Sequence, residues 1–169
     1  MNSLNNSKPG FGIFKTILFA WLLAGTLDLL AAIAWFLMAG GKEPSRVFMF
    51  IASGYFGKAA FAQAITGGDQ MTAMGILFHY LIAFCFTVLF FLVYPKIQLL
   101  QKSVFLSAVL FGVFTWLVMN IVVVPLSKIN TATFHPLNVC IGIFILILLF
   151  SLPIAVIIKQ FYKNQLSRQ

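Results

Sequence analysis

Acidic residues are almost absent from this sequence. Only three of its 169 residues are Asp or Glu, against eleven Lys and Arg, and charged residues of both signs make up 8% of the chain. A soluble globular domain typically carries about a quarter charged residues, because its surface faces water on all sides. The shortage of charge therefore argues against a soluble domain.

Patterns typical of catalytic and metal sites are also missing. Two cysteines and two histidines are few for a metal or haem site, and the cysteines lack Cys-x-x-Cys spacing. The sequence contains no Gly-rich phosphate loop, no Gly-x-Ser-x-Gly elbow and no His-Glu-x-x-His motif. We therefore predict no catalytic residue, no metal and no cofactor, and we favour a protein that is not an enzyme.

Apolar residues fill the gaps between the charges. Hydrophobic residues make up 62% of the chain, and the mean hydropathy is +1.03. Each uncharged run is long enough for a bilayer, which takes about 20 helical residues. The first run is interpreted as a span and not as a signal peptide, because Asp28 would interrupt a signal core. The predicted fold is an all-α membrane protein, a four-transmembrane-helix bundle in one integral membrane domain, with spans at about 16–40, 72–94, 103–124 and 137–158 and tails at 1–12 and 160–169.

The distribution of charge predicts the orientation of this bundle. Four spans place both termini on the same side as the loop between the second and third spans. That side carries seven cations and no acid: Lys8, Lys15, Lys96, Lys102, Lys159, Lys163 and Arg168. By the positive-inside rule this side is cytoplasmic, in a bacterial inner membrane. The net charge of +8 is then explained by topology and by the lipid bilayer as partner, without nucleic acid.

The segment between the first two spans is too apolar for a free loop and too interrupted for a span. Pro44 and Ser45 resemble a helix start, and Gly67 and Gly68 resemble a stop. Apolar residues recur at helical spacing on one face: Val47, Phe48, Ile51, Tyr55 and Ala59. We predict an interfacial amphipathic helix at about 45–65, which either anchors the protein at the membrane surface or covers a cavity that opens outward.

Polar residues of three spans fall at one depth. Counted from the cytoplasmic ends, Asp28, Trp116, His79 and Asn120 lie roughly 18, 20, 22 and 25 Å along their helices. Small residues flank them at helical spacing, which lets membrane helices approach one another closely. We therefore predict that this layer faces the interior of the bundle.

Asp28 needs a partner in that layer. A carboxylate turned to lipid costs about 2.5 to 3.5 kcal/mol on insertion scales. His79 is the predicted partner, with Asn120 and Thr115 as secondary ones, and Trp116 belongs to the same predicted polar cluster by position alone. An Asp–His pair can exchange a proton near neutral pH, which suits a proton relay or a coupled transporter. The same groups can equally act as hydrogen-bonded glue between helices.

Two further residues are notable in the second half of the chain. His135 lies in the outer loop "SKINTATFHPLN" and is a candidate site residue there, although a loop histidine near the start of a helix is the simpler interpretation. Pro153, in "FSLPIAVII", removes a backbone donor from the fourth span. We predict a kink at this proline.

Several segments resemble a known group of proteins. They are "DLLAAIAW", "FIASGYFGKAAF", "GILFHYLIAFCFTVLFFLVYPKIQLLQ", "GVFTWLVMNIVVVPLS" and "LLFSLPIAVIIK". The pattern is similar to small uncharacterised bacterial inner-membrane proteins that are distantly YagU-like. This resemblance implies four spans and brings no substrate, cofactor or catalytic residue. Relatives with this pattern often carry a further histidine in the fourth span, where this chain has "IGIFILILLF".

Three hypotheses about function remain. The first is small-solute or proton-coupled transport through the polar layer around Asp28 and His79. The second is a structural or regulatory membrane subunit in which the layer only holds helices together. The third is a lipid- or quinone-directed membrane enzyme with His79 or His135 as its base. Because one copy of 169 residues encloses little volume, a homodimer is a further hypothesis.

Overall fold

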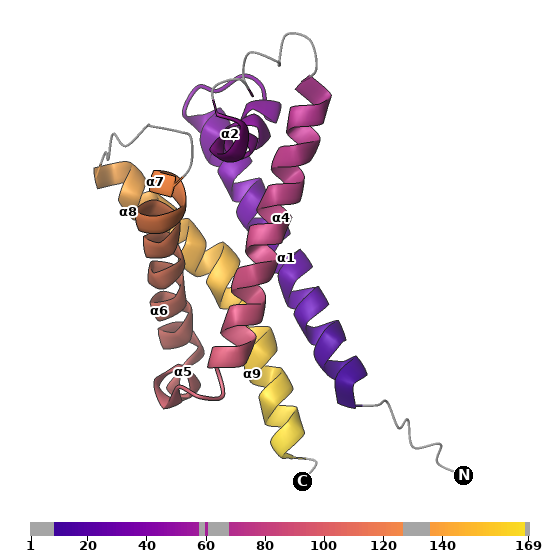
Figure 1. The fold of residues 1–169 in the computed structure, drawn as a ribbon. Helices are drawn as coiled ribbons and strands as arrows, with labels where there is room; N and C mark the ends of the chain where they lie inside the picture. The colour runs from indigo at the N-terminus through magenta and orange to yellow at the C-terminus, as the bar shows by residue number, and fades with distance from the viewer. Residues whose placement is uncertain (1–8, 58–59, 61–67, 127–135, 168–169) are drawn as a thin grey trace.

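Four long helices form the framework of the molecule (Figure 1). The computed structural model describes residues 9–57, 60, 68–126 and 136–167. Within these residues, four helices are long and apolar enough to cross a membrane: Gly12–Met38, Gly68–Val93, Val104–Val123 and Pro136–Leu166. The prediction of an all-α chain with four such helices is confirmed.

The third and fourth helices each change type along their length. Both contain a π-helical segment, in which the backbone is more widely wound than in an α-helix. The elements in chain order are α1 (Pro9–Met38), α2 (Ser45–Phe56), α4 (Gly68–Val93), α5 (Gln98–Lys102), α6 (Val104–Leu117), η2 (Val118–Val123), α7 (Val124–Leu126), α8 (Pro136–Ile145), η3 (Leu146–Ser151) and α9 (Leu152–Leu166). The start of α1, the short helix α5 and the end of α9 lie at one end of the bundle, and α2 and α7 lie at the other (Figure 1).

The first and fourth helices are longer than the predicted spans. The first begins at Pro9, before Thr16, and the fourth continues beyond Ile158 to Leu166. Both extensions carry lysines, which limit an apolar span but not a helix. A helix ends where its backbone bonding stops, and that point differs from the point where its surface turns polar.

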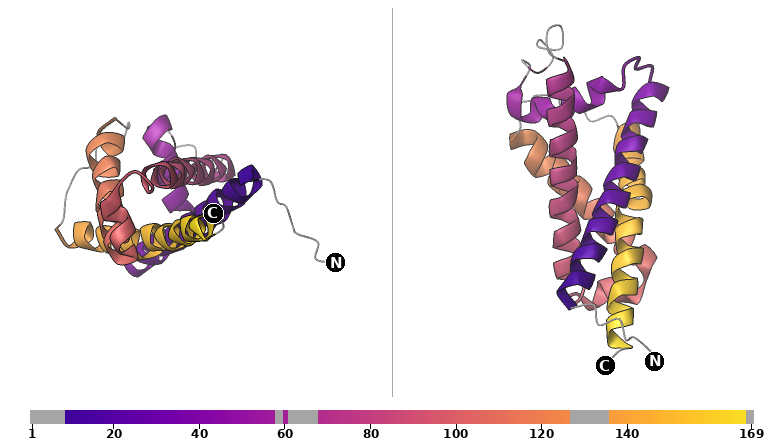
Figure 2. Two further views of the ribbon diagram at one scale, coloured as in Figure 1. Left: turned by 90° about the horizontal axis from the view of Figure 1, so that it is seen from below. Right: turned by 90° about the vertical axis from the view of Figure 1, so that its right-hand side faces the viewer.

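The amphipathic segment after the first long helix forms α2. This helix begins at Ser45, as predicted, and crosses the long helices at one end of the bundle (Figure 2, right). Phe56 is its last residue, and Gly57 follows with φ of 69°, a left-handed conformation that favours glycine and ends helices. Most of the predicted remainder, residues 58–59 and 61–65, lies outside the described residues.

The face of α2 that packs on the bundle differs from the predicted one. Met49, Ala52 and Ser53 are buried, whereas Tyr55 is 66% exposed. The contact with α4 is close at Gly75, where a Cβ atom would collide with the backbone carbonyl of Phe48. This backbone contact sets the rotation of α2, which side-chain periodicity alone does not determine.

Fully buried alanines lie in the interior beside larger core residues such as Phe90 and Ile154, and many other large apolar residues face outward. Ala20 and Ala24 of α1, Ala108 of α6 and Ala155 of α9 are fully buried. Large apolar residues on the long helices are more than half exposed, among them Phe14, Phe19, Leu30, Leu77, Phe105 and Phe144. Such a distribution is typical of membrane bundles, in which close helix contact depends on small residues because lipid is as apolar as leucine.

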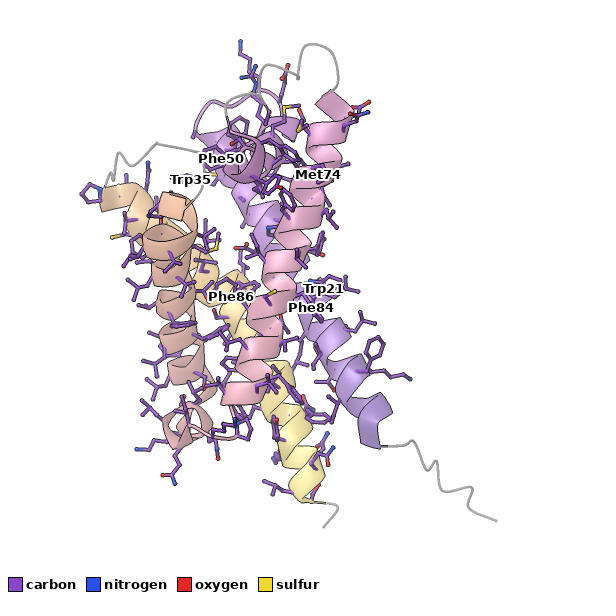
Figure 3. All side chains as sticks on the ribbon, viewed as in Figure 1. Trp21, Trp35, Phe50, Met74, Phe84 and Phe86 are labelled. Carbon is purple, nitrogen blue, oxygen red and sulfur yellow. The ribbon has the colours of Figure 1, made fainter. Side chains whose placement is uncertain are left out.

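Aromatic rings join α1 to α4. Trp21 lies against Phe84, with ring centroids 5.3 Å apart (Figure 3). Its indole Nε1–H also donates a hydrogen bond of 2.7 Å to the carbonyl oxygen of Tyr80. The Tyr80 hydroxyl in turn lies 2.9 Å from Thr26 Oγ1. These contacts fix the relative positions of the two helices beside the polar residues described next.

Candidate functional site

A cavity of about 230 Å³ lies between the helices at the depth of the predicted polar layer. Three polar side chains line it: Asp28 of α1, His79 of α4 and Thr115 of α6. The other lining residues are apolar: Ile51, Ile82, Ala83, Phe86, Met119, Leu146 and Phe150. The long helices and α2 thus bring three polar groups together in otherwise apolar surroundings.

His79 lines the cavity and also contacts the backbone of α1. Its Nε2 atom lies 2.8 Å from the carbonyl oxygen of Gly25. A carbonyl oxygen only accepts hydrogen bonds, so Nε2 carries a hydrogen and donates it. The other ring nitrogen, Nδ1, then accepts a proton when the ring becomes charged.

Gly25 allows this close approach of the two helices. It is buried, and a Cβ atom at this position would lie 3.3 Å from the Tyr80 ring and 3.4 Å from the Cβ atom of Ala83. The absence of a side chain therefore keeps the carbonyl of Gly25 within reach of the imidazole.

Asp28 lies three residues after Gly25 and therefore on the same face of α1. Its carboxyl group is partly buried, lines the cavity and interacts electrostatically with His79. A carboxylate and an imidazolium attract each other most strongly where water is scarce. Asp28 and His79, its predicted partner, thus line the same cavity, and within the described residues no salt bridge joins them.

Thr115 differs from the other helical threonines of this protein. Thr16, Thr72 and Thr87 each donate a hydrogen bond of 2.8 Å to the carbonyl oxygen four residues earlier. Thr115 is only 2% exposed, yet its Oγ1 atom has no hydrogen-bond partner within the described part of the chain. A buried hydroxyl without a partner costs about 1 to 3 kcal/mol. Thr115 lines the cavity, and its hydroxyl is enclosed there without a bond to the described part of the protein.

The two π-helical segments border the cavity. Met119 belongs to η2, and Leu146 and Phe150 belong to η3. Each segment ends two residues before a proline, at Pro125 and Pro153. Proline cannot donate a backbone hydrogen bond and its ring crowds the preceding turn, so the helix widens there. The sequence predicted a kink at Pro153, and what the structure shows there is the π-helical segment Leu146–Ser151, which ends two residues before the proline.

Trp116 and Asn120 do not line the cavity, although both were predicted to share its layer. Asn120 Nδ2 donates a 2.9 Å hydrogen bond to the Trp116 carbonyl in its own helix. The Trp116 indole lies toward Gly142 of α8. Residues spaced four apart drift by about 40° per step around an α-helix, so the buried seam passes from Gly112 to Thr115. Residues spaced exactly four apart therefore move progressively away from the buried face of the helix.

Ile51 was not predicted as a cavity residue, and its position bears on the two interpretations of α2. It reaches the cavity from a helix outside the four long ones. This contact favours a cover over the cavity more than a simple surface anchor. The signal in the sequence was the apolar periodicity of the segment 45–65, since Ile51 belonged to its predicted apolar face. The other outer candidate, His135, lies outside the described residues.

Ligand sets for a metal are not found among the described residues, since no group of three or more His, Cys, Asp or Glu side chains gathers there. Comparisons of the chain with protein families, with curated proteins and with solved structures find no match. The distant resemblance to YagU-like proteins therefore stays a prediction, and the function has to be inferred from the site itself.

Proposed function

We propose that this protein spans a membrane four times and couples proton movement to the passage of a small polar solute through the cavity of Asp28, His79 and Thr115. The observation that carries the proposal is the convergence of an acid, an imidazole and an unpartnered hydroxyl on one cavity. Polar groups inside a membrane are costly, and they are retained where they serve a pathway or hold helices together.

The outward-facing apolar residues and the charge distribution support the membrane placement. The end of the bundle with α5 carries Lys15, Lys96, Lys102, Lys159 and Lys163. The acids Glu43 and Asp69 lie at the other end, near α2 and the start of α4. By the positive-inside rule the lysine-rich end is cytoplasmic, so both termini face the cytoplasm.

The size of the cavity limits the solute. Pockets for drug-sized ligands have about 300 to 1,000 Å³, and a water molecule takes up about 30 Å³ in the liquid. A cavity of about 230 Å³ therefore suits a small molecule that carries at least one hydrogen-bonding group. Asp28 can bond this group while the apolar walls contact the remainder.

The pair of Asp28 and His79 can supply the coupling. When the imidazole takes up a proton at Nδ1, the charged ring attracts the carboxylate, and when it loses the proton, the carboxylate becomes available to a donor on the solute. Proton binding and solute binding thus change one another's free energy at a single site. The π-helical segments and α2 border this site, and they are the elements whose movement would open it.

A structural role is the second candidate, and one observation favours it. The bond from His79 to the carbonyl of Gly25 joins α4 to α1, as do the bonds of Trp21 and Thr26 to Tyr80. Polar contacts of this kind contribute about 0.6 to 2 kcal/mol each in membranes. On this account the cavity is a packing defect, and substitutions at Asp28 change stability alone.

Proton flux separates the two candidates. The full chain would be reconstituted into liposomes that contain a pH-sensitive dye, and a potassium diffusion potential would drive protons. We expect vesicles with the wild-type protein to acidify faster than empty vesicles, and vesicles with Asp28→Asn to acidify no faster than empty ones. Asp69→Asn, a change at an exposed acid of α4 outside the cavity, should acidify its vesicles as fast as wild type. Equal flux in wild type and Asp28→Asn, together with a lowered melting temperature of the variant, would support the structural role instead.

A further inference from the structure

A second, larger cavity lies at the opposite end of the molecule from α2. It measures about 640 Å³ and lies where α1 begins and α9 ends. Its walls come from α1, the end of α4, the turn into α5, and α9. It shares no lining residue with the cavity of Asp28 and His79.

Two lysines give this second cavity a positive charge. Lys159 and Lys163 both line it and are four residues apart on α9, so they lie on one face of that helix. Within the described residues, neither forms a salt bridge, because the ion pair found there is that of Arg46 with Glu43, at 3.3 Å.

No acidic side chain of this chain is in place to neutralise those lysines. The sequence contains three acids. Asp28 lines the other cavity, Glu43 pairs with Arg46, and Asp69 lies in the first turn of α4, a full helix length from the second cavity. Two ammonium groups beside apolar walls therefore attract an anion from outside the protein.

Hydrogen-bonded side chains hold the shape of the second cavity. The Tyr162 hydroxyl donates a 3.1 Å bond to the carbonyl oxygen of Phe91. Gln101 Nε2 donates to the carbonyl oxygens of Pro95 at 3.0 Å and of Tyr94 at 3.3 Å. The rings of Tyr94 and Tyr162 stack with centroids 5.5 Å apart. The turn between α4 and α5 is thus fixed against α9, and the cavity does not depend on the position of a single side chain.

The lining is amphipathic, and this indicates the class of ligand. Besides the lysines and tyrosines it contains the apolar residues Ile13, Phe91, Phe161 and Leu166. A free inorganic anion would use only the charged part. An anionic amphiphile would use both parts, because its charged group can meet the lysines while its chains lie along the apolar helices. Basic pockets between membrane helices on the cytoplasmic side commonly accept anionic lipid headgroups.

We propose that the cavity of Lys159 and Lys163 binds the phosphate headgroup of an anionic phospholipid, with the acyl chains along the apolar flank of α1 and α9. The proposal shares the membrane placement with the proposed function but does not depend on proton transport. It adds a lipid-binding site at the end of the bundle where the lysines gather.

Native mass spectrometry of the full chain in a neutral detergent tests this site. The protein would be titrated with phosphatidylglycerol and, separately, with phosphatidylcholine. We expect specific adducts of the first lipid, and roughly a tenfold or greater loss of affinity in Lys159→Gln/Lys163→Gln, since each lysine near an anionic lipid contributes appreciably to binding. The matched control is Lys96→Gln/Lys102→Gln, which removes the same charge from exposed residues outside the cavity and is expected to bind almost as wild type.

Three outcomes would overturn the proposal. An equal loss of phosphatidylglycerol affinity in both double variants would mean general attraction by surface charge. Equal binding of both lipids would mean that the net negative charge of the headgroup is not recognised. Displacement of the lipid by millimolar inorganic phosphate would mean a site for a free anion. Melting curves show whether the variants fold. If Lys159→Gln/Lys163→Gln unfolds, the single variant Lys163→Gln, at an exposed residue, is compared with Lys102→Gln as its control. Unchanged lipid affinity in Lys163→Gln would also count against the site.

Discussion

The Nε2 atom of His79 lies 2.8 Å from the carbonyl oxygen of Gly25, one helical turn before Asp28. The same imidazole therefore binds the backbone of α1 through one nitrogen and lines the same cavity as the carboxyl group of Asp28. This double role makes His79 both a structural contact and a candidate proton carrier, and suitable substitutions separate the two roles.

His79→Gln is expected to keep the structural role and lose the proton. The amide Nε2 of glutamine can donate to the carbonyl of Gly25 in place of the imidazole, but an amide does not titrate near neutral pH. We predict a melting temperature close to wild type and no proton flux in liposomes. His79→Leu should lose the flux and also about 0.6 to 2 kcal/mol of stability. Flux retained in the glutamine variant would show that His79 carries no proton.

Thr115→Val replaces the unpartnered hydroxyl with a methyl group of similar volume. Because Oγ1 is buried without a hydrogen bond, its removal should leave stability unchanged or raise it by about 1 kcal/mol. The control is Thr87→Val, which removes a 2.8 Å bond to the carbonyl of Ala83 and should lower stability by about 1 kcal/mol. Thermal unfolding in detergent gives both values. A clear destabilisation by Thr115→Val would indicate that its hydroxyl is bonded within the protein.

Gly75→Ala tests the packing of α2 on α4. An added Cβ atom would collide with the backbone carbonyl of Phe48, and this backbone atom cannot move away by a rotamer change as a side chain can. We predict a loss of about 1 to 3 kcal/mol in unfolding experiments. Gly142→Ala is the control, since its nearest neighbour would be Trp116 Nε1 at 3.7 Å, an ordinary contact. Similar stability of both variants would contradict the position of α2.

Pro153→Ala should reduce the π-helical character of residues 146–151. The alanine regains a backbone N–H and can bond within an α-helix. We predict slower amide hydrogen exchange in this segment and a lower rate of proton flux, because the wide turn borders the cavity. Pro136→Ala, at the first residue of α8, should change neither quantity, since proline is tolerated in the first helical turn. Unchanged exchange in Pro153→Ala would mean that the π-helical segment arises from packing alone.

The long helices and the depth of the polar residues could be predicted from the sequence. Charges are so rare that the gaps between them mark four apolar helices, and a rise of about 1.5 Å per residue brings Asp28 and His79 to similar depths. Both predictions use position along the chain only. The structure places these two side chains at one cavity, with Thr115 as the third polar group.

Rotation about the helix axis could not be predicted in the same way. Trp116 and Asn120 lie at the right depth but on another face of their helix. In α2, Met49 and Ala52 are buried, whereas Tyr55 of the predicted apolar face is exposed. Nearly every face of such helices is apolar, so periodicity gives little information about which face is buried. The π-helical segments add to the difficulty, because they change the angle between successive residues.

Nitrogen-15 NMR of the histidines in lipid bilayers tests most directly whether Asp28 and His79 act as one proton-binding site. The chain contains two histidines, and His135→Gln leaves the signals of His79 alone. Asp28→Asn is expected to alter the pH dependence of the His79 Nδ1 resonance, whereas Asp69→Asn is not. An Nδ1 resonance with the same pH dependence in wild type and Asp28→Asn would show that the two groups do not act as one proton-binding site.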